Sequence, residues 1–513
     1  MTLHNLYGLL LQASINSTRG EELSIYDSNN KIHCAWSYAT LLKDSEIRSA
    51  KIQHGKDIVL EKNRVVVLYL EDHQHMISWF WAVIALGGIP CLLPPLTGNE
   101  KRNVQLSTLQ KLLGNPWFLT SSNLLSDLVS VHDIRTASID DIDRTSISED
   151  SKIIRPEIPE TEGNPAILML TSGSTGGPKA VSLRYRQIIA ALEGKVKIHK
   201  TTRDDVFLNF MGLHHVANLM EIHLHALYCG ARQFHVEKSA FLNSPLDFLE
   251  KVNRHRVSYA FCPNFFLSSL VNALESPGHN KWLKIRRGSD RAAQLGSNSR
   301  VSSGIRPPND FDNPLGAKVY PPEFSKLKRH DISSLRALVS GGEPSLTNTC
   351  SKLESLLCEY NVPRNFIKPG FGMTETCAGS IYNVMDCPGY DLARKSGFVN
   401  VGVCMPGIKV RVMRQDGTEA NDNETGSLQL SGPVVFKEYF NSPTETANSF
   451  TNDGWFKSRD LASLDENGRL YFCGRENDTI VSNGYGRLFL CFFQRRGRLT
   501  LPGSNIHRTR SKQ

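Results

Sequence analysis

A short polar loop at residues 171–179 contains the residue types that bind phosphate. It follows an apolar run at 168–170 and ends on a lysine. Its hydroxyl and glycine residues are Thr171, Ser172, Gly173, Ser174, Thr175, Gly176 and Gly177. The glycines let backbone N–H groups approach phosphate oxygens closely, and Lys179 adds a positive charge on a flexible stem. The loop therefore predicts a cradle for a phosphate ligand.

The loop differs from the Walker A motif of P-loop nucleotidases. The pattern G-x-x-x-x-G-K-[ST], counted from Gly173, requires a glycine at position 178, which is a proline here. Taken alone, the loop could also be an ordinary serine- and glycine-rich turn. The choice between these interpretations depends on the rest of the chain.

Three further motifs follow the loop in order: SGGEP at 340–344, GFGMTET at 370–376, and DGWFKSRDLASLDENGRLYFCGREND at 453–478. Together with T-S-G-S-T-G-x-P-K at 171–179, they resemble the adenylate-forming superfamily. That family includes acyl-CoA synthetases, luciferases and the adenylation domains of nonribosomal peptide synthetases. The resemblance extends from about residue 1 to 484.

The resemblance implies a two-step reaction. A carboxylate attacks the α-phosphate of ATP, giving an acyl-adenylate and pyrophosphate, and a thiol of CoA or of a carrier-bound phosphopantetheine then takes the acyl group. Transfer at phosphorus depends on positioning and charge neutralisation more than on covalent help. ATP and Mg²⁺ are the implied cofactors, and a small carboxylic acid is the implied substrate. A carrier protein or a polyketide or peptide synthase is a possible partner.

The resemblance also implies individual roles. Thr374 would touch phosphate, and Glu375 would be the Mg²⁺ carboxylate, since Mg²⁺ takes one or two carboxylates plus phosphate oxygens. Phe371 would stack on adenine, where the family more often has tyrosine. Asp460 would accept hydrogen bonds from both ribose hydroxyls, and Arg475 would contact ribose or phosphate. The other residues expected around the nucleotide are Lys179, Gly341, Gly342, Glu343, Gly370 and Gly372.

The acyl group is expected near residues 208–236, LNFMGLHHVANLMEIHLHALYCGARQFHV. In the family this region places a histidine or aromatic gate beside the acyl carboxylate, and His215 is the better match of the adjacent pair, with His214 as the alternative. Residues 261–270 resemble the next wall of the pocket. The sequence MGLHH has no acid to pair with a substrate ammonium, which favours an aryl or aliphatic acid over an α-amino acid. The amino-acid sequences of residues 72–96 and 221–231 resemble those of adenylation units of fungal-type secondary metabolism.

The chain departs from the family in several places. The usual T-G-D at the ribose is Ser458, Arg459 and Asp460, so a bulky residue stands where glycine is usual. Residues 276–329 look like an irregular insertion, and 485–513 like a basic tail without family pattern. Family members continue after the hinge with a small mobile domain that carries a catalytic lysine, and we expect that domain to be absent. Gene-model errors, a truncated nucleotide-binding remnant and one subunit of a split ligase all remain open.

The elements that must position these residues alternate between strand and helix. Apolar runs at 65–70, 165–173 and 335–340 predict strands, and 72–87, 184–198 and 265–274 predict helices. This alternation predicts an α/β fold with a mainly parallel sheet, whose ligands bind at the carboxyl ends of strands. We expect an adenylation core at 1–400, a β-rich subdomain at 401–476 and a hinge remnant at 477–484.

Composition narrows the function further. The net charge of +8 is concentrated in two irregular segments, so it does not indicate nucleic-acid binding. Eleven cysteines occur singly without a C-x-x-C pair, which favours reduced thiols and a cytoplasmic enzyme. The N-terminus lacks the pattern of a secretory signal. The apolar stretch 76–93 is interrupted by Gly87, Gly88 and Pro90, so a buried helix and strand are favoured over a membrane span.

Overall fold

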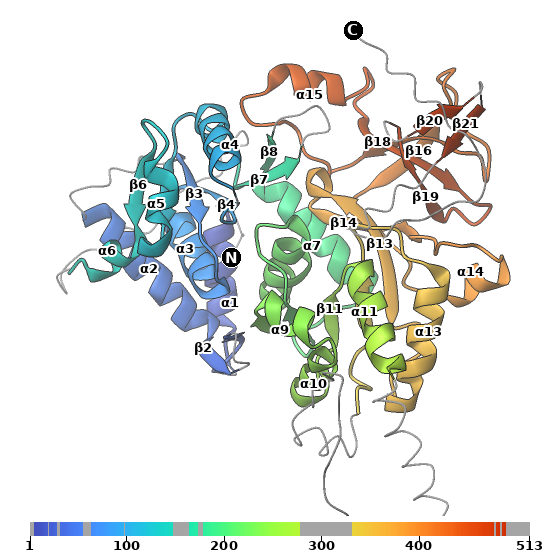
Figure 1. Ribbon diagram of the computed structural model, residues 1–513, viewed down its shortest axis with the longest axis horizontal. Coiled ribbons are helices and arrows are strands. Elements are labelled where there is room, and N and C mark those ends of the chain that lie inside the picture. The colour runs from blue at the N-terminus through green and yellow to red at the C-terminus, as the bar shows by residue number, and fades with distance from the viewer. Residues whose placement is uncertain are drawn as a thin grey trace, which may run out of the picture.

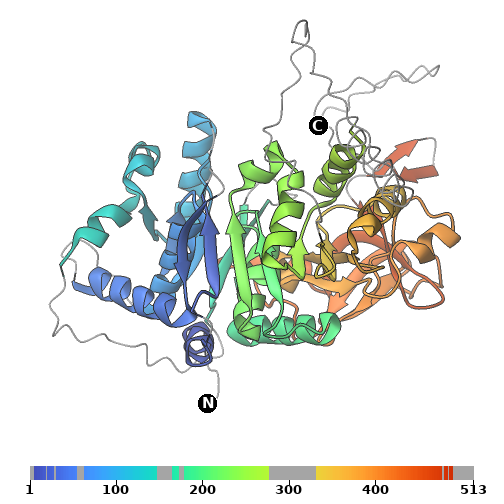
Figure 2. The same ribbon diagram turned by 90° about the horizontal axis from the view of Figure 1, so that it is seen from below.

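The computed structural model shows two layered α/β sheets and a smaller β-rich part (Figure 1). It describes residues 5–18, 20–27, 31–54, 63–96, 98–146, 164–172, 178–276, 331–476, 479–482 and 485–488. In both views the N-terminal residues lie at one side, the green central segments in the middle and the orange C-terminal segments at the other side (Figures 1 and 2). The expected insertion at 276–329 and the tail at 485–513 lie almost entirely outside the described residues.

The first sheet is formed by the N-terminal segments. Within the described residues its strands run, in spatial order, β6 (Arg135–Ser138), β5 (Trp117–Thr120), β3 (Val65–Tyr69), β4 (Ile89–Leu93), β7 (Ile167–Ser172) and β8 (Pro178–Leu183). Neighbouring strands are parallel except β7 and β8, which pair antiparallel on either side of the loop 173–177. The sequence predicts β7 but not β8.

The second sheet forms the centre of the molecule. Among the described residues its order is β15 (Val403–Cys404), β14 (Ala378–Tyr382), β13 (Ile367–Met373), β12 (Ala337–Ser340), β11 (Tyr259–Phe261), β9 (Val206–Asn209), β10 (Arg232–Val236), β1 (Leu23–Tyr26) and β2 (Ile32–Trp36). The strands from β13 to β1 are parallel, and the outer pairs are antiparallel. The expected α/β fold with mainly parallel sheets is therefore confirmed.

Helices cover both faces of the two sheets. They are α1 (Leu6–Ile15), α2 (Tyr38–His54), α3 (His73–Leu86), α4 (Asn99–Leu112), α5 (Leu125–Val129), α6 (Ile139–Arg144), α7 (Tyr185–His199), α8 (Leu224–Cys229), α9 (Lys238–Asn243), α10 (Leu246–His255), α11 (Asn264–Glu275), α13 (Thr347–Leu357) and α14 (Gly389–Ala393). Strand β3 shows how the core is divided. Val66 and Leu68 join the central core between the sheets, whereas Val65, Val67 and Tyr69 join the core under α4 and α5.

Helix α3 is apolar all round because it lies within the central core. Its bounds match the expected 72–87 closely: the Asp72 side chain caps the first turn, and Gly87 ends the helix at φ 83°. Twelve of its residues are buried, as expected of an internal helix. In the part of the chain that the structure describes, no helix combines the length and apolar character needed to cross a bilayer.

The β-rich part is a separate antiparallel sheet. Its strands are β16 (Lys409–Met413), β17 (Gly426–Ser431), β18 (Phe456–Leu464) and β19 (Leu470–Arg475), with α15 (Pro443–Ser449) between β17 and β18. A short hairpin of β20 (Thr479–Ser482) and β21 (Tyr485–Leu488) follows. Strands β16 to β19 fall in the range 401–476 expected to be β-rich, whereas the hairpin lies beyond it, across the expected hinge remnant and the start of the expected tail. The domain boundaries themselves stay predictions.

The glycine motif at 370–372 forms part of a strand. Two closely spaced glycines usually indicate a turn, but these lie inside β13, which pairs antiparallel with β14. The glycines are needed there because the two strands approach closely. A Cβ added at Gly372 would lie 1.9 Å from the backbone oxygen of Ala378.

Candidate active site

A cavity of about 320 Å³ lies at the carboxyl ends of the central strands. It is lined by residues at or just beyond the ends of β7, β9, β11 and β12 and by the β13–β14 pair. This is where ligands bind in open α/β sheets. Seven residues that the sequence predicts for the site line it: His215, Gly341, Gly342, Glu343, Gly370, Gly372 and Thr374.

Part of the cavity lining is apolar. It includes Leu170, Met211, Phe261, Phe265 and Val339. The last three come from the ends of neighbouring β11 and β12 or from the start of α11, so the sheet edge itself shapes this wall. Such a surface suits an apolar acyl group.

His214 and His215 stand side by side on this cavity, with ring centroids 4.4 Å apart. Desolvation, together with the positive charges of His215 and Lys238, lowers the pKa of His214 to about 3. Desolvation and Lys238 also lower the pKa of His215, whose side chain is the more exposed of the two. Both rings are therefore neutral at neutral pH, and neither repels a cation nor pairs with an anion.

A buried ion pair closes one end of the cavity. Glu221 lies in the π-helical turn η2 (Asn218–His223), and its Oε1 is 2.7 Å from Lys195 Nζ of α7. The side chains are 1% and 0% exposed, respectively. Glu221 also accepts hydrogen bonds from Gly379 N at 2.9 Å and from the hydroxyls of Tyr382 and Tyr259. Its charge is therefore already compensated.

His223, the last residue of turn η2, connects the turn to its surroundings by two hydrogen bonds. This ring accepts a hydrogen bond from Trp81 Nε1 at 2.9 Å, and its other nitrogen lies 2.9 Å from Gln233 Oε1. Because indole N–H can only donate, His223 must carry its proton on the nitrogen that faces Gln233. Burial lowers the pKa of His223 to about 4, so the ring stays neutral and the network is satisfied.

The charged residues expected around the phosphates meet at Tyr439. Its hydroxyl donates to Glu375 Oε1 at 2.8 Å, and Lys179 Nζ lies 5.0 Å from the centroid of its ring. Lys179 also pairs with Glu445 of α15 at 2.5 Å. The structure thus brings Lys179 and Glu375, 196 positions apart in the sequence, to the two sides of one aromatic side chain.

Glu375 is a buried carboxylate that could bind a cation. It is buried at the turn η5 (Thr374–Thr376), and burial raises its pKa, while the Tyr439 hydrogen bond and the nearby charges of Lys179 and Arg475 act in the opposite direction. The described residues contain no cluster of three or more His, Cys, Asp or Glu side chains for a metal. A single carboxylate fits Mg²⁺ that is shared with phosphate oxygens.

Asp460 and Arg475 pair across β18 and β19, with Arg475 Nε 3.3 Å from Asp460 Oδ1. Burial raises the pKa of Asp460 to about 6 despite the arginine. Arg459 beside it has a φ of 63°, in the left-handed region that glycine adopts without cost. Glycine would adopt this conformation without strain, whereas Arg459 adopts it at a cost in conformational energy.

Several predicted residues do not line the cavity. Phe371 stacks on Phe472 at 6.2 Å and is partly buried. Thr171 is described at the end of β7, whereas the Ser172 side chain and residues 173–177, which include Gly173, Ser174, Thr175, Gly176 and Gly177, lie outside the described residues. The adenine-stacking role of Phe371 and the phosphate-binding roles of residues 171–177 stay predictions.

Sequence reasoning missed Glu221, Lys195, Tyr382, Tyr439 and Glu445. Only Glu221 carries a usable signal, since a lone acid inside the apolar stretch at 216–227 predicts a buried carboxylate with a partner. The identity of that partner depends on how α7 packs against η2.

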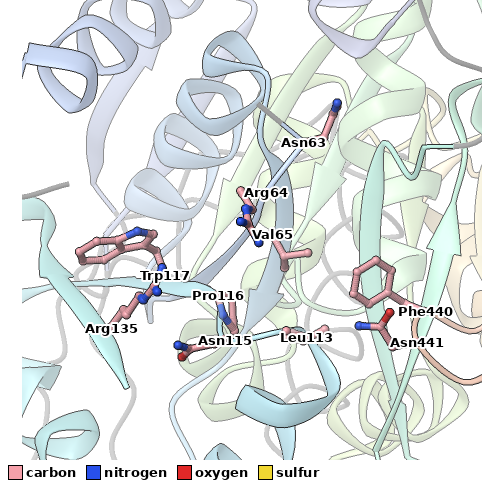
Figure 3. Close-up of a pocket in the computed structure, with 11 residues that line it drawn as sticks. Asn63, Arg64, Val65, Leu113, Asn115, Pro116, Trp117, Arg135, Phe440 and Asn441 are labelled. Carbon is pink, nitrogen blue, oxygen red and sulfur yellow. The ribbon is translucent and has the colours of Figure 1, made fainter. Parts of the chain in front are cut away.

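A second cavity, of about 270 Å³, lies at the opposite, amino-terminal ends of β3, β5 and β6 (Figure 3). Trp117 and Arg135 lie on one side of it and Phe440 and Asn441 on the other, with Arg64 between them (Figure 3). None of the residues expected to bind nucleotide or acid lines it. Seven of them line the first cavity instead.

Comparison with known proteins identifies the family of the chain. The model of the family described as "AMP-binding enzyme" matches residues 13–440. The nonribosomal peptide synthetase acyN of Ascocoryne sarcoides is 35% identical over 487 residues, covering 94% of this chain and 47% of that protein. Microperfuranone synthase of Emericella nidulans is 36% identical, covering 94% and 46%. Aspulvinone E synthetase melA of Aspergillus terreus is 36% identical, covering 93% and 46%. The chain spans about half the length of these relatives.

Solved structures show the same fold. The adenylation and carrier domains of McyG with phenylalanyl-adenylate align with a TM-score of 0.77 at 25% identity, covering 95% of this chain and 78% of that one. The adenylation domain of a keto acid-selecting synthetase module aligns at 0.75 with 22% identity, covering 94% and 82%. O-succinylbenzoate CoA synthetase of Bacillus subtilis with ATP and magnesium aligns at 0.69 with 22% identity, covering 93% and 81%.

Proposed function

Because this chain belongs to the AMP-binding enzyme family, we propose that it activates a carboxylic acid with ATP, forming an acyl-adenylate and releasing pyrophosphate. The observation that carries the proposal is the 320 Å³ cavity, which runs from residues 341–343 to His215. A nucleotide at one end and an acid at the other would place the carboxylate beside the α-phosphate. Such positioning supplies much of the rate enhancement of a two-substrate reaction.

In the first step a carboxylate oxygen attacks the α-phosphorus, and the bond from that phosphorus to the oxygen bridging to the β-phosphate breaks. Pyrophosphate leaves with the electron pair of that bond. Lys179, Thr374 and the loop residues 171–177 would bind the phosphate oxygens as charge moves onto the leaving group. Mg²⁺, when bound, would neutralise part of this charge, and Glu375 is the residue that would hold it.

The nucleoside would lie along the glycine motifs. Gly341, Gly342 and Glu343 would border the adenine. Gly370 and Gly372 would let the adenine approach the backbone of β13. Phe371 would supply a stacking face. Asp460, supported by Arg475, would accept hydrogen bonds from the ribose hydroxyls.

The acid is proposed to be an aryl or aliphatic one without an ammonium group. An α-amino acid needs a free anion near its ammonium, and Glu221 is the acidic side chain at the acyl end of the described cavity lining. Its carboxylate is already neutralised by Lys195 at 2.7 Å and by three further hydrogen-bond donors. Leu170, Met211 and Phe261 would instead contact apolar carbon.

The acceptor of the acyl group is proposed to be a thiol, either CoA or the phosphopantetheine of a carrier protein. Similarity to three synthetases of fungal secondary metabolism supports the carrier over free CoA. A role in secondary-metabolite biosynthesis in the cytoplasm is part of the same proposal.

Acid-dependent exchange of labelled pyrophosphate into ATP tests this function. 3-Phenylpropanoate and phenylalanine form a matched pair, because phenylalanine adds only an α-ammonium group, and phenylacetate and hexanoate test a second aryl acid and an aliphatic one. We expect exchange with an acid that lacks an ammonium group and little with phenylalanine, and we expect Glu375→Gln to abolish it while Glu275→Gln, an exposed control, does not. Binding of ATP without exchange for any acid would instead favour a nucleotide-binding remnant or one subunit of a split ligase.

A further inference from the structure

Tyr439 lies between two charged groups that the proposed reaction needs. The residue is buried and belongs to the segment 434–440, which connects β17 with α15. Nothing in the sequence motifs marks it, because it lies well after GFGMTET and before the ribose motif. Its contacts nevertheless join the loop lysine to the carboxylate at Glu375.

The hydroxyl of Tyr439 acts on Glu375 directly. It donates to Oε1 at 2.8 Å, and the backbone N–H of Phe436 donates to the carbonyl oxygen of Glu375 at 2.8 Å. Both contacts come from the same segment and reach the same residue from the side chain and the main chain. Hydrogen bonds to a charged group are about twice as strong as neutral ones and fix its direction.

The ring of Tyr439 acts on Lys179. The ammonium lies 5.0 Å from the ring centroid, within the distance at which a cation is attracted to an aromatic face. Glu445 holds the same ammonium at 2.5 Å from its other side. Lys179 is 11% exposed, so its position is set by these two neighbours more than by water.

The segment that carries Tyr439 is itself tied to the phosphate loop. Phe440 N donates to Ala180 O at 2.8 Å, and Ser182 N donates to the Glu438 oxygen at 3.2 Å, so residues 438–440 extend the edge of β8. The Tyr439 N–H is taken up by Thr446 Oγ1 at 2.9 Å. Strand β8, which carries Lys179, is therefore hydrogen-bonded to the residues on both sides of Tyr439.

We propose that Tyr439 is a positioning residue for adenylation: its hydroxyl orients the Glu375 carboxylate, and its ring holds Lys179 at a fixed distance from that carboxylate. The inference rests on the proposed function, because it assigns the two charged groups to the metal and the phosphates of ATP. It adds a residue outside the recognised motifs and explains how both groups keep their places before ATP arrives.

Calorimetric titration of the full chain with ATP, with Mg²⁺ and with EDTA, tests the inference without requiring turnover. The readout is the factor by which Mg²⁺ tightens ATP binding. Tyr439→Phe keeps the ring and loses the hydroxyl, so this factor should fall by about tenfold while ATP binding in EDTA is unchanged. Tyr439→Leu loses the ring as well, so binding in EDTA should also weaken, by about threefold.

Phe450→Leu is the matched control. Phe450 packs in the same aromatic cluster, 5.4 Å from Phe436, and within the described residues it makes no hydrogen bond or ring contact with Lys179 or Glu375. It should leave both binding constants near wild type, and urea unfolding of all variants reports their folding. An unchanged magnesium factor in a folded Tyr439→Phe protein, or an equal loss in Phe450→Leu, would overturn the inference alone. Failure of the wild-type chain to bind ATP would overturn the proposed function with it.

Discussion

Removal of Lys195 should be one of the most destabilising single changes near the site. The substitution Lys195→Met keeps the length of the side chain but leaves Glu221, 1% exposed, without its cation. Breaking a buried pair in this way costs about 3–5 kcal/mol of unfolding free energy, because an uncompensated charge stays behind. Glu221 keeps three other donors, from Gly379, Tyr382 and Tyr259, so we expect the lower end, about 3 kcal/mol.

Urea unfolding, extrapolated linearly to water, measures this loss. Lys352→Met is the control, because Lys352 pairs with Glu275 at 3.2 Å on the surface, where both side chains are about half exposed. That change should stay within about 0.5 kcal/mol of wild type. The double variant Lys195→Met with Glu221→Gln removes the charge as well and should recover more than half of the loss.

The same substitution should change the acid that is accepted. In Lys195→Met the Glu221 carboxylate at the cavity is no longer neutralised, so phenylalanine should gain in pyrophosphate exchange relative to phenylacetate. Equal destabilisation by Lys195→Met and Lys352→Met would refute the reasoning, because it would mean that the pair is neither desolvated nor needed. An unchanged acid preference in a folded variant would refute the link to specificity.

Three further predictions concern the nucleotide site and the core. Nucleotide affinity should fall as the pH is lowered through about 6, because burial raises the pKa of Asp460 to about 6. Only the ionised form of Asp460 accepts hydrogen bonds from both ribose hydroxyls. Asp460→Asn should remove this pH dependence in calorimetric titrations. His223→Leu leaves the buried Trp81 Nε1–H without its acceptor and should cost about 1–3 kcal/mol in urea unfolding. Gly372→Ala should reduce the melting temperature strongly, since its Cβ would meet the Ala378 oxygen at 1.9 Å.

Much of the fold follows from local sequence patterns. Helix α3 ends where the sequence places it, because Asp72 caps one end and Gly87 adopts a positive φ at the other. Strand β3 is likewise marked by its continuous run of branched and aromatic residues. These signals are contained within the element itself, so no tertiary information is required to see them.

The strand β8 and the glycines of β13 could not be placed in this way. Residues 178–183 begin with proline and follow a glycine loop, which locally favours a turn, and the strand exists because β7 offers its edge. Gly370 and Gly372 look like turn residues in sequence. Only the approach of β14 shows that they permit close strand contact instead.

The residues of the site likewise fall into those that local motifs predict and those that only tertiary packing brings together. Thr374, Glu375 and Asp460 belong to short motifs and could be named from the sequence, although their roles stay predictions. Lys195 and Glu221 are 26 positions apart, and Tyr439 and Glu375 are 64 apart. Their contacts depend on how α7, η2 and the segment 434–440 pack around the central sheet, which no local pattern encodes.

Trapping of the acyl-adenylate with hydroxylamine tests the central claim most directly. Hydroxylamine attacks the activated carbonyl and releases AMP, so each acid that is adenylated gives its hydroxamate, detectable by mass spectrometry. We expect hydroxamate from an acid without an ammonium group only when ATP and Mg²⁺ are present, and none from Glu375→Gln. Wild-type protein that binds ATP yet forms no hydroxamate with any acid, or that releases ADP and phosphate instead of AMP, would contradict it.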